Sequence, residues 1–133
     1  MIDTSNGENL PGYKKKSFAI PYSGGDIWIE HLDGIYEYEE LVLCKLESDI
    51  NLFTKPSSTS YICFVFHETI ITDCIIDMVR RAILESGKRF TKIAFVGIDR
   101  KSKRKLGRIF KNKGLCFNFV DGLEDAKQWF VTK

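Results

Sequence analysis

The chain lacks the sequence features that mark several large classes of protein. None of its apolar runs approaches the roughly 20 residues that a membrane-spanning helix needs. The first nine residues are polar and do not contain the apolar segment of a secretory signal peptide. We therefore expect a cytoplasmic protein without a transmembrane segment.

Metal-binding spacing is also missing. The four cysteines include no C-x-x-C pair, and the two histidines are not spaced with them as zinc ligands would be. We expect no metal, no cofactor, and reduced cysteines that serve as small apolar residues of the structure. The cysteines are Cys44, Cys63, Cys74 and Cys116.

Large net charge is absent as well. The formal net charge is only +2, and 44% of the residues are hydrophobic, which is typical of a globular protein. A chain of 133 residues is long enough for one core and too short for two ordinary domains. We expect a flexible N-terminal leader at 1–16, which ends in a basic triplet, and one domain at 17–133.

Hydrophobic periodicity predicts a mixed α/β fold. Apolar runs indicate strands at 17–20, 27–32, 61–66, 92–98 and 115–120, and helical spacing indicates helices at 36–53, 72–86, 100–112 and 121–129. The first two strands flank a Gly-Gly turn at 23–26 and should form an antiparallel hairpin. Strands joined by helices should be parallel. The expected architecture is a mixed, mostly parallel five-stranded sheet with an N-terminal antiparallel hairpin and flanking helices.

Local signals define several helix ends. Thr72 and Asp99 stand where helix N-caps belong, and Gly87 and Gly114 stand where helices should stop. Asp121 and Glu124 have the spacing of a capping box. The buried face of the second helix is predicted to consist of Ile75, Ile76, Val79, Ala82 and Ile83.

The strongest charge feature is a basic helix after the strand at 92–98. Eight Lys or Arg residues fall between 100 and 113, and Leu106, Ile109 and Phe110 form the apolar face. Its N-terminus makes Arg100, Lys101 and Arg104 candidate residues for binding an anion or a partner. No aromatic residues interleave these cations, so the pattern does not favour nucleic acid. A solvated face that serves solubility is the simpler interpretation.

Two other motifs have weaker chemical content. The turn at 97–100 has one glycine where a dinucleotide-binding loop needs three, so a nucleotide site is not expected. His67 and Glu68 follow a predicted parallel strand and could act as an acid–base pair, and Thr69 or Thr72 could accept a phosphoryl group. A polar loop with a capping threonine explains the same residues without chemistry.

The segments at 92–110 and 121–131, with the turn before the helix at 72–86, resemble the STAS/SpoIIAA-like proteins, above all the small, often uncharacterised bacterial members. The resemblance covers residues 61–131 well. It implies a regulatory, non-enzymatic role, a mixed sheet with flanking helices, and a phosphorylation switch at the turn that holds Thr69 and Thr72. The Ser-Gly element of that switch is missing here. Some relatives are thought to bind lipids or small apolar ligands.

Four hypotheses follow. The first, which we favour, is a regulatory domain that binds a protein partner. The others are a binding module for a small anionic or lipid-like ligand near the basic helix, an enzyme that uses His67 and Glu68, and a nucleic-acid-binding protein.

Overall fold

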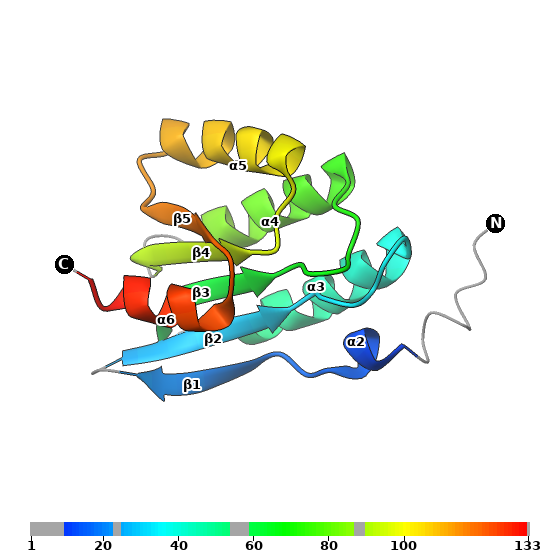
Figure 1. Ribbon diagram of the computed structural model, residues 1–133, viewed down its shortest axis with the longest axis horizontal. Coiled ribbons are helices and arrows are strands. Elements are labelled where there is room, and N and C mark those ends of the chain that lie inside the picture. The colour runs from blue at the N-terminus through cyan, green and yellow to red at the C-terminus, as the bar shows by residue number, and fades with distance from the viewer. Residues whose placement is uncertain (1–9, 23–24, 54–58, 87–89, 133) are drawn as a thin grey trace.

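A five-stranded mixed sheet forms the centre of the fold (Figure 1). The computed structural model describes residues 10–22, 25–53, 59–86 and 90–132. The strands lie side by side in chain order; β1 pairs antiparallel with β2, and every later pair is parallel. The predicted mixed α/β sheet with an antiparallel hairpin at one edge is confirmed. The strands are β1 (Phe18–Tyr22), β2 (Gly25–His31), β3 (Thr59–Val65), β4 (Lys92–Val96) and β5 (Phe117–Val120).

Three of the helices cover one face of the sheet, and a fourth covers the other (Figure 1). The strand order advances by one neighbour at each crossover, and crossovers of one hand then place their helices on the same face. Such an order also contains no point at which the strand order reverses, where open α/β sheets usually form a ligand crevice. The helices are α2 (Pro11–Lys14), α3 (Glu39–Phe53), α4 (Asp73–Glu85), α5 (Arg100–Asn112) and α6 (Leu123–Phe130), and α3, α4 and α5 share a face.

The sheet buries side chains on both faces, as its apolar strands predict. On β3, Ile62 and Phe64 belong to the core beneath α3–α5, and Cys63 and Val65 belong to the smaller core beneath α6. The predicted apolar stripe of α4 is buried throughout. On α5, Leu106 is 1% exposed. Phe110 of α5 stacks on Phe95 of β4 with 5.7 Å between ring centroids, so α5 is fixed to the sheet through its apolar side.

Helix ends follow the predicted caps at two positions and depart from prediction at two others. Thr72 and Asp99 cap α4 and α5, as expected. The helix predicted from residue 36 begins at Glu39, because Tyr36 has φ +53° and a left-handed residue cannot lie inside a right-handed helix. The N-cap of α6 is Gly122, without a side-chain hydrogen bond, so the capping role predicted for Asp121 is wrong.

The predicted leader contacts the domain through Gly12 and Lys15. Residues 11–14 form α2, and Gly12 is buried against the loop after β2. A Cβ on Gly12 would lie 2.2 Å from the carbonyl oxygen of Asp33, so only glycine fits there. The Lys15 ammonium lies 2.8 Å from the Asp33 carboxylate. These contacts hold the described part of the leader against the end of β2.

The expectation of four buried cysteines is correct only for Cys63. Burial raises the pKa of its thiol to about 12. Cys44, Cys74 and Cys116 are exposed, because two lie on the outer sides of α3 and α4 and the third precedes the edge strand β5.

Parts of three predictions fall outside the described residues: Ser23 and Gly24 of the turn predicted at 23–26, residues 54–58 of the predicted loop after the first helix, and Gly87 as the residue after α4. Among the helices that the structure describes, none combines the length and apolar character needed to cross a bilayer.

Candidate functional site

The loops after β2 and β3 run side by side at the carboxyl edge of the sheet. The Gly34 amide donates to the His67 carbonyl at 2.8 Å, and the Tyr36 amide donates to the Glu68 carbonyl at 2.9 Å. The parallel pairing of β2 and β3 therefore continues beyond both strands and gives these loops fixed positions.

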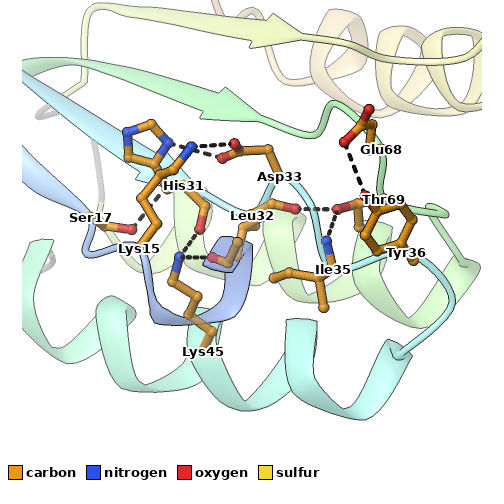
Figure 2. A network of polar contacts seen from close by, with 11 residues as sticks. Lys15, Ser17, His31, Leu32, Asp33, Ile35, Tyr36, Lys45, Glu68 and Thr69 are labelled. Carbon is orange, nitrogen blue, oxygen red and sulfur yellow. Dashed lines mark hydrogen bonds and ion pairs between the residues drawn. The ribbon is translucent and has the colours of Figure 1, made fainter. Parts of the chain in front are cut away.

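Thr69 joins the two loops through its side chain (Figure 2). Its hydroxyl donates to the Leu32 carbonyl at 2.6 Å and accepts from the Ile35 amide at 3.1 Å. Both hydrogen-bonding roles of the hydroxyl are thus used within the chain. A phosphoryl group on this oxygen would require both contacts to break.

Tyr36 and Glu68 face each other in an uncommon backbone conformation. Their φ angles are +53° and +57°, in the left-handed region that costs a non-glycine residue about 1–2 kcal/mol. The Tyr36 hydroxyl donates to Glu68 Oε2 at 3.2 Å, and the Glu68 charge raises the pKa of the Tyr36 phenol. Backbone strain that the surrounding contacts maintain is frequent at binding sites.

An exposed apolar pair lies at the same place. Tyr36 is 44% exposed and Ile70 is 60% exposed. They are held together because the Ile70 amide donates to the Tyr36 carbonyl at 2.9 Å. Glu37 and Glu68, both exposed, supply negative charge beside them. We call Tyr36, Glu37, Glu68 and Ile70 the edge patch.

A second polar group fixes the loop after β2 to the N-terminal segment (Figure 2). The Asp33 carboxylate lies 2.9 Å from His31 Nδ1 as well as beside Lys15. Burial by itself would raise the pKa of Asp33, but the hydrogen bonds from His31 and Lys15 outweigh it and hold the pKa below its usual value. Ser17 completes the group, since its hydroxyl accepts from the His31 amide at 2.9 Å.

A buried carboxyl lies between β2 and α3. Glu30 is fully buried, and the Trp28 indole N–H donates to its Oε1 at 2.8 Å. Burial, reinforced by the neighbouring Asp49 carboxyl, raises the pKa of Glu30 well above its usual value. A proton on Glu30 Oε2 would give a partner both to that oxygen and to Asp49 Oδ2, which otherwise lack one.

The structure gives His67 and Glu68 separate contacts. Glu68 meets Tyr36, whereas the His67 ring packs against Gly97 of the neighbouring loop, where a Cβ would lie 2.7 Å from His67 Nδ1. The residues predicted as an acid–base pair thus have different neighbours.

Thr72 and Asp73 belong to the start of α4. Thr72 Oγ1 accepts from the Ile75 amide at 3.3 Å, which is the N-cap hydrogen bond. Asp73 forms an ion pair with Lys105 of α5, and that contact lowers the pKa of Asp73. The turn that holds the candidate phosphorylation sites therefore touches the basic helix through Asp73.

The candidate residues Arg100, Lys101 and Arg104 are exposed on the first turns of α5. A groove of about 390 Å³ lies between α4 and α5, but its lining includes Lys105 and Arg108 instead, with Ile76 and Ile109 as apolar members. The sequence correctly located a basic helix. It did not distinguish the cations that line the groove from those that face solvent.

No cluster of three or more His, Cys, Asp or Glu side chains suitable for a metal ion occurs within the described ranges. No protein-family model matches the chain, and neither a curated protein nor a solved structure matches it significantly.

Sequence reasoning missed the edge patch and the buried Glu30. Glu30 left a signal, because it comes two residues after Trp28 in a predicted strand and therefore lies on the same face of the sheet as that large apolar side chain. The edge patch left none, since Tyr36 and Glu68 are 32 positions apart and meet only through the pairing of their loops.

Proposed function

We propose that this chain is a non-enzymatic regulatory domain of STAS/SpoIIAA-like type that binds a protein partner through the edge patch. The resemblance of residues 61–131 to that superfamily motivates the regulatory role. The observation that carries the binding site is the exposed pair Tyr36–Ile70, held on two loops whose backbone is fixed by Thr69.

The chemistry of the edge patch specifies the kind of partner surface. A tyrosine beside an aliphatic side chain supplies the rigid contact area typical of interface hot spots. Glu37 and Glu68 add negative charge at its rim, which favours a partner with Lys or Arg around an apolar anchor. Because the loops are already hydrogen-bonded to each other, binding would cost little ordering of this surface.

Affinity capture from a lysate of the native host, followed by mass spectrometry, tests this proposal. The wild-type chain should recover a reproducible partner, and Ile70→Asp should reduce its recovery roughly tenfold or more. Leu52→Asp is the matched control, because Leu52 is 54% exposed on α3 and Ile70 is 60% exposed. The control should retain the partner.

The proposal fails if no partner is reproducibly recovered, or if Ile70→Asp and Leu52→Asp behave alike. Circular dichroism of both variants separates loss of binding from loss of fold.

A small anionic or lipid-like ligand is the second candidate function, and the groove between α4 and α5 favours it. The groove combines apolar Ile76 and Ile109 with three cations and two carboxylates, which are Arg80, Lys105, Arg108, Asp73 and Asp77. Native mass spectrometry with a long-chain fatty acid should show a complex that Arg108→Glu weakens and Arg104→Glu leaves intact. An equal effect of both variants would exclude the groove as the site.

A further inference from the structure

Helix α5 is the most strongly charged element that the structure describes. Seven of its 13 residues are Lys or Arg, and its sequence contains no Asp or Glu. Six of the seven cations are exposed: Arg100, Lys101, Lys103, Arg104, Arg108 and Lys111.

The exposed cations form a continuous surface along the helix. Ser102, Leu106 and Phe110 are buried and define the side of α5 that faces the sheet. Arg100, Arg104 and Arg108 recur every four residues and therefore share one line on the exposed side, spanning about 12 Å at 1.5 Å per residue. In Figure 1, α5 is the outermost helix of its layer, next to α4 on one flank. We call these three residues the arginine row.

The negative charge near this surface lies on α4, where Asp73 and Asp77 line the groove that Arg108 also lines. Among the ion pairs within the described ranges, the Asp73–Lys105 pair is the one that involves a cation of α5. The Asp99 carboxylate at the N-terminus accepts hydrogen bonds from the amide and the hydroxyl of Ser102, both at 2.8 Å. No ion pair within the described ranges involves the arginine row, so these side chains can meet charge on another molecule.

The position of the arginine row along the exposed side of a helix favours a polymeric anion over a small one. No member of the arginine row except Arg108 lines the groove beside α5, so the row does not converge on a cavity. A small anion could touch only one or two of these side chains. A polymer with regularly spaced charges can touch several, and each phosphate neutralised releases condensed counterions into solution.

The buried and exposed sides of α5 together distinguish between polymeric anions. A helix that binds a membrane inserts its apolar side, but Leu106 and Phe110 are already buried beneath the helix. A single-stranded nucleic acid would need aromatic side chains on which bases stack, and α5 exposes none. A duplex needs neither, because its backbone presents phosphates on the outside.

We propose that α5 is a sequence-independent docking surface for the phosphate backbone of a double-stranded nucleic acid. This surface is separate from the edge patch, so the protein would bring a regulatory contact and a nucleic acid together. The expectation against nucleic acid rested on the absence of stacking residues, and that absence bears on single strands and not on duplex backbones.

Fluorescence anisotropy with a labelled 20-base-pair duplex of arbitrary sequence tests the proposal. The wild-type dissociation constant should lie around 10⁻⁴–10⁻⁶ M near physiological salt, with a slope of log K against log salt of roughly −3 to −5. A second duplex of unrelated sequence should bind equally well.

Three triple variants provide the decisive comparison, and the two that introduce glutamates change the net charge by the same amount. Arg100→Glu/Arg104→Glu/Arg108→Glu should abolish binding, whereas Arg100→Lys/Arg104→Lys/Arg108→Lys should keep it, since backbone contacts require charge and not a particular side chain. Lys14→Glu/Lys16→Glu/Arg81→Glu lowers the net charge by the same amount at exposed positions outside α5 and should retain most of the affinity. Circular dichroism checks that each variant is folded, and the lysine variant tests the surface even if the glutamate variant does not fold.

Four results would overturn the proposal. The first is that no duplex binding is measurable at 50 mM salt, and the second is that the two glutamate variants lose duplex affinity equally. The third is that duplex binding does not depend on salt. The fourth is that the protein binds phosphatidylserine vesicles more tightly than the duplex and loses that binding when the arginine row is changed to glutamate. The last result would assign α5 to a membrane surface. The capture experiment with Ile70→Asp tests the edge patch and does not depend on duplex binding. The proposal for the edge patch and the proposal for α5 can therefore fail independently.

Discussion

The carboxyl edge of the sheet and helix α5 carry most of the polar side chains considered above, and they are built in opposite ways. At the edge, hydroxyls, carboxylates and backbone amides bind one another across two loops, with Thr69 and Asp33 each making at least two contacts. On α5, most cations make no ion pair within the described part of the chain. The edge is therefore held by its polar contacts, and α5 is held by the apolar residues beneath it.

This difference implies that substitutions at the two regions should affect different properties. Changes at the edge should lower stability, because they leave buried or half-buried polar groups without partners. Changes on the exposed side of α5 should alter binding and change the free energy of unfolding by about 1 kcal/mol or less.

The largest expected effect is a difference in stability loss between alanine substitutions at two glycines that have similar backbone angles. Gly97, at the edge, has φ +76°, and a Cβ there would lie 2.7 Å from the His67 backbone nitrogen. Gly114, after α5, has φ +68° and nothing within 4 Å of a Cβ. Gly97→Ala should lower the free energy of unfolding by about 3 kcal/mol, and Gly114→Ala by about 1 kcal/mol, because only the first adds overpacking to the left-handed strain. Urea denaturation measures both, and equal losses would contradict the contrast.

The next effect concerns the threonine that joins the two loops. Thr69→Val keeps the shape of the side chain but removes the hydroxyl, which donates a hydrogen bond to the Leu32 carbonyl and accepts one from the Ile35 amide. We expect a loss of about 2 kcal/mol, since two half-buried backbone groups lose their partner. Thr69→Ser keeps the hydroxyl and should recover more than half of that loss. If serine and valine destabilise equally, the hydroxyl does not hold the loops together.

A smaller effect should appear in the pH dependence of stability. The pKa of Asp33 lies below its usual value of 3.8 in the folded chain, so its contribution is present above about pH 4 and is lost as the pH falls below that value. Asp33→Asn should cost about 1 kcal/mol at pH 7 and progressively less toward pH 2. Thermal melts between pH 2 and pH 7 measure this convergence. Asp77→Asn, at an exposed carboxylate of α4, is the control and should run parallel to the wild type.

The sequence predicted α5 well and the carboxyl edge poorly, for a physical reason. Cations, apolar spacing and the Asp99 cap are local signals within the 14 residues from Asp99 to Asn112, and they located α5 at its observed boundaries. The edge depends on contacts such as Tyr36–Glu68 and Thr69–Leu32, which arise only when β2 and β3 pair. No window of sequence contains both partners of such a contact.

Burial was similarly hard to infer where it depends on neighbouring elements. The stripe of α4 follows from periodicity alone and was predicted residue by residue. The exposure of Cys116 follows from the position of β5 at the sheet edge, which its apolar surroundings in the sequence do not reveal. Glu30 shows the converse, a charged residue buried because α3 covers its strand.

The smallest expected effect on stability gives the most information about α5. Arg104 has Arg100 and Arg108 four residues away on either side, and like charges at that spacing destabilise a helix by about 0.2–0.5 kcal/mol per pair. Arg104→Glu replaces two repulsive pairs with two attractive ones, so we expect it to raise the free energy of unfolding by about 0.8 kcal/mol, four times the lower limit of that range. Urea denaturation in low salt measures this gain. Arg104→Gln should lie midway, and added salt should reduce both gains because it screens the charges. A gain would mean that the arginine row opposes folding, so its role must be found in what it binds. A loss larger than about 0.5 kcal/mol would mean that these cations stabilise the fold, and the charge of α5 would then need no partner to explain it.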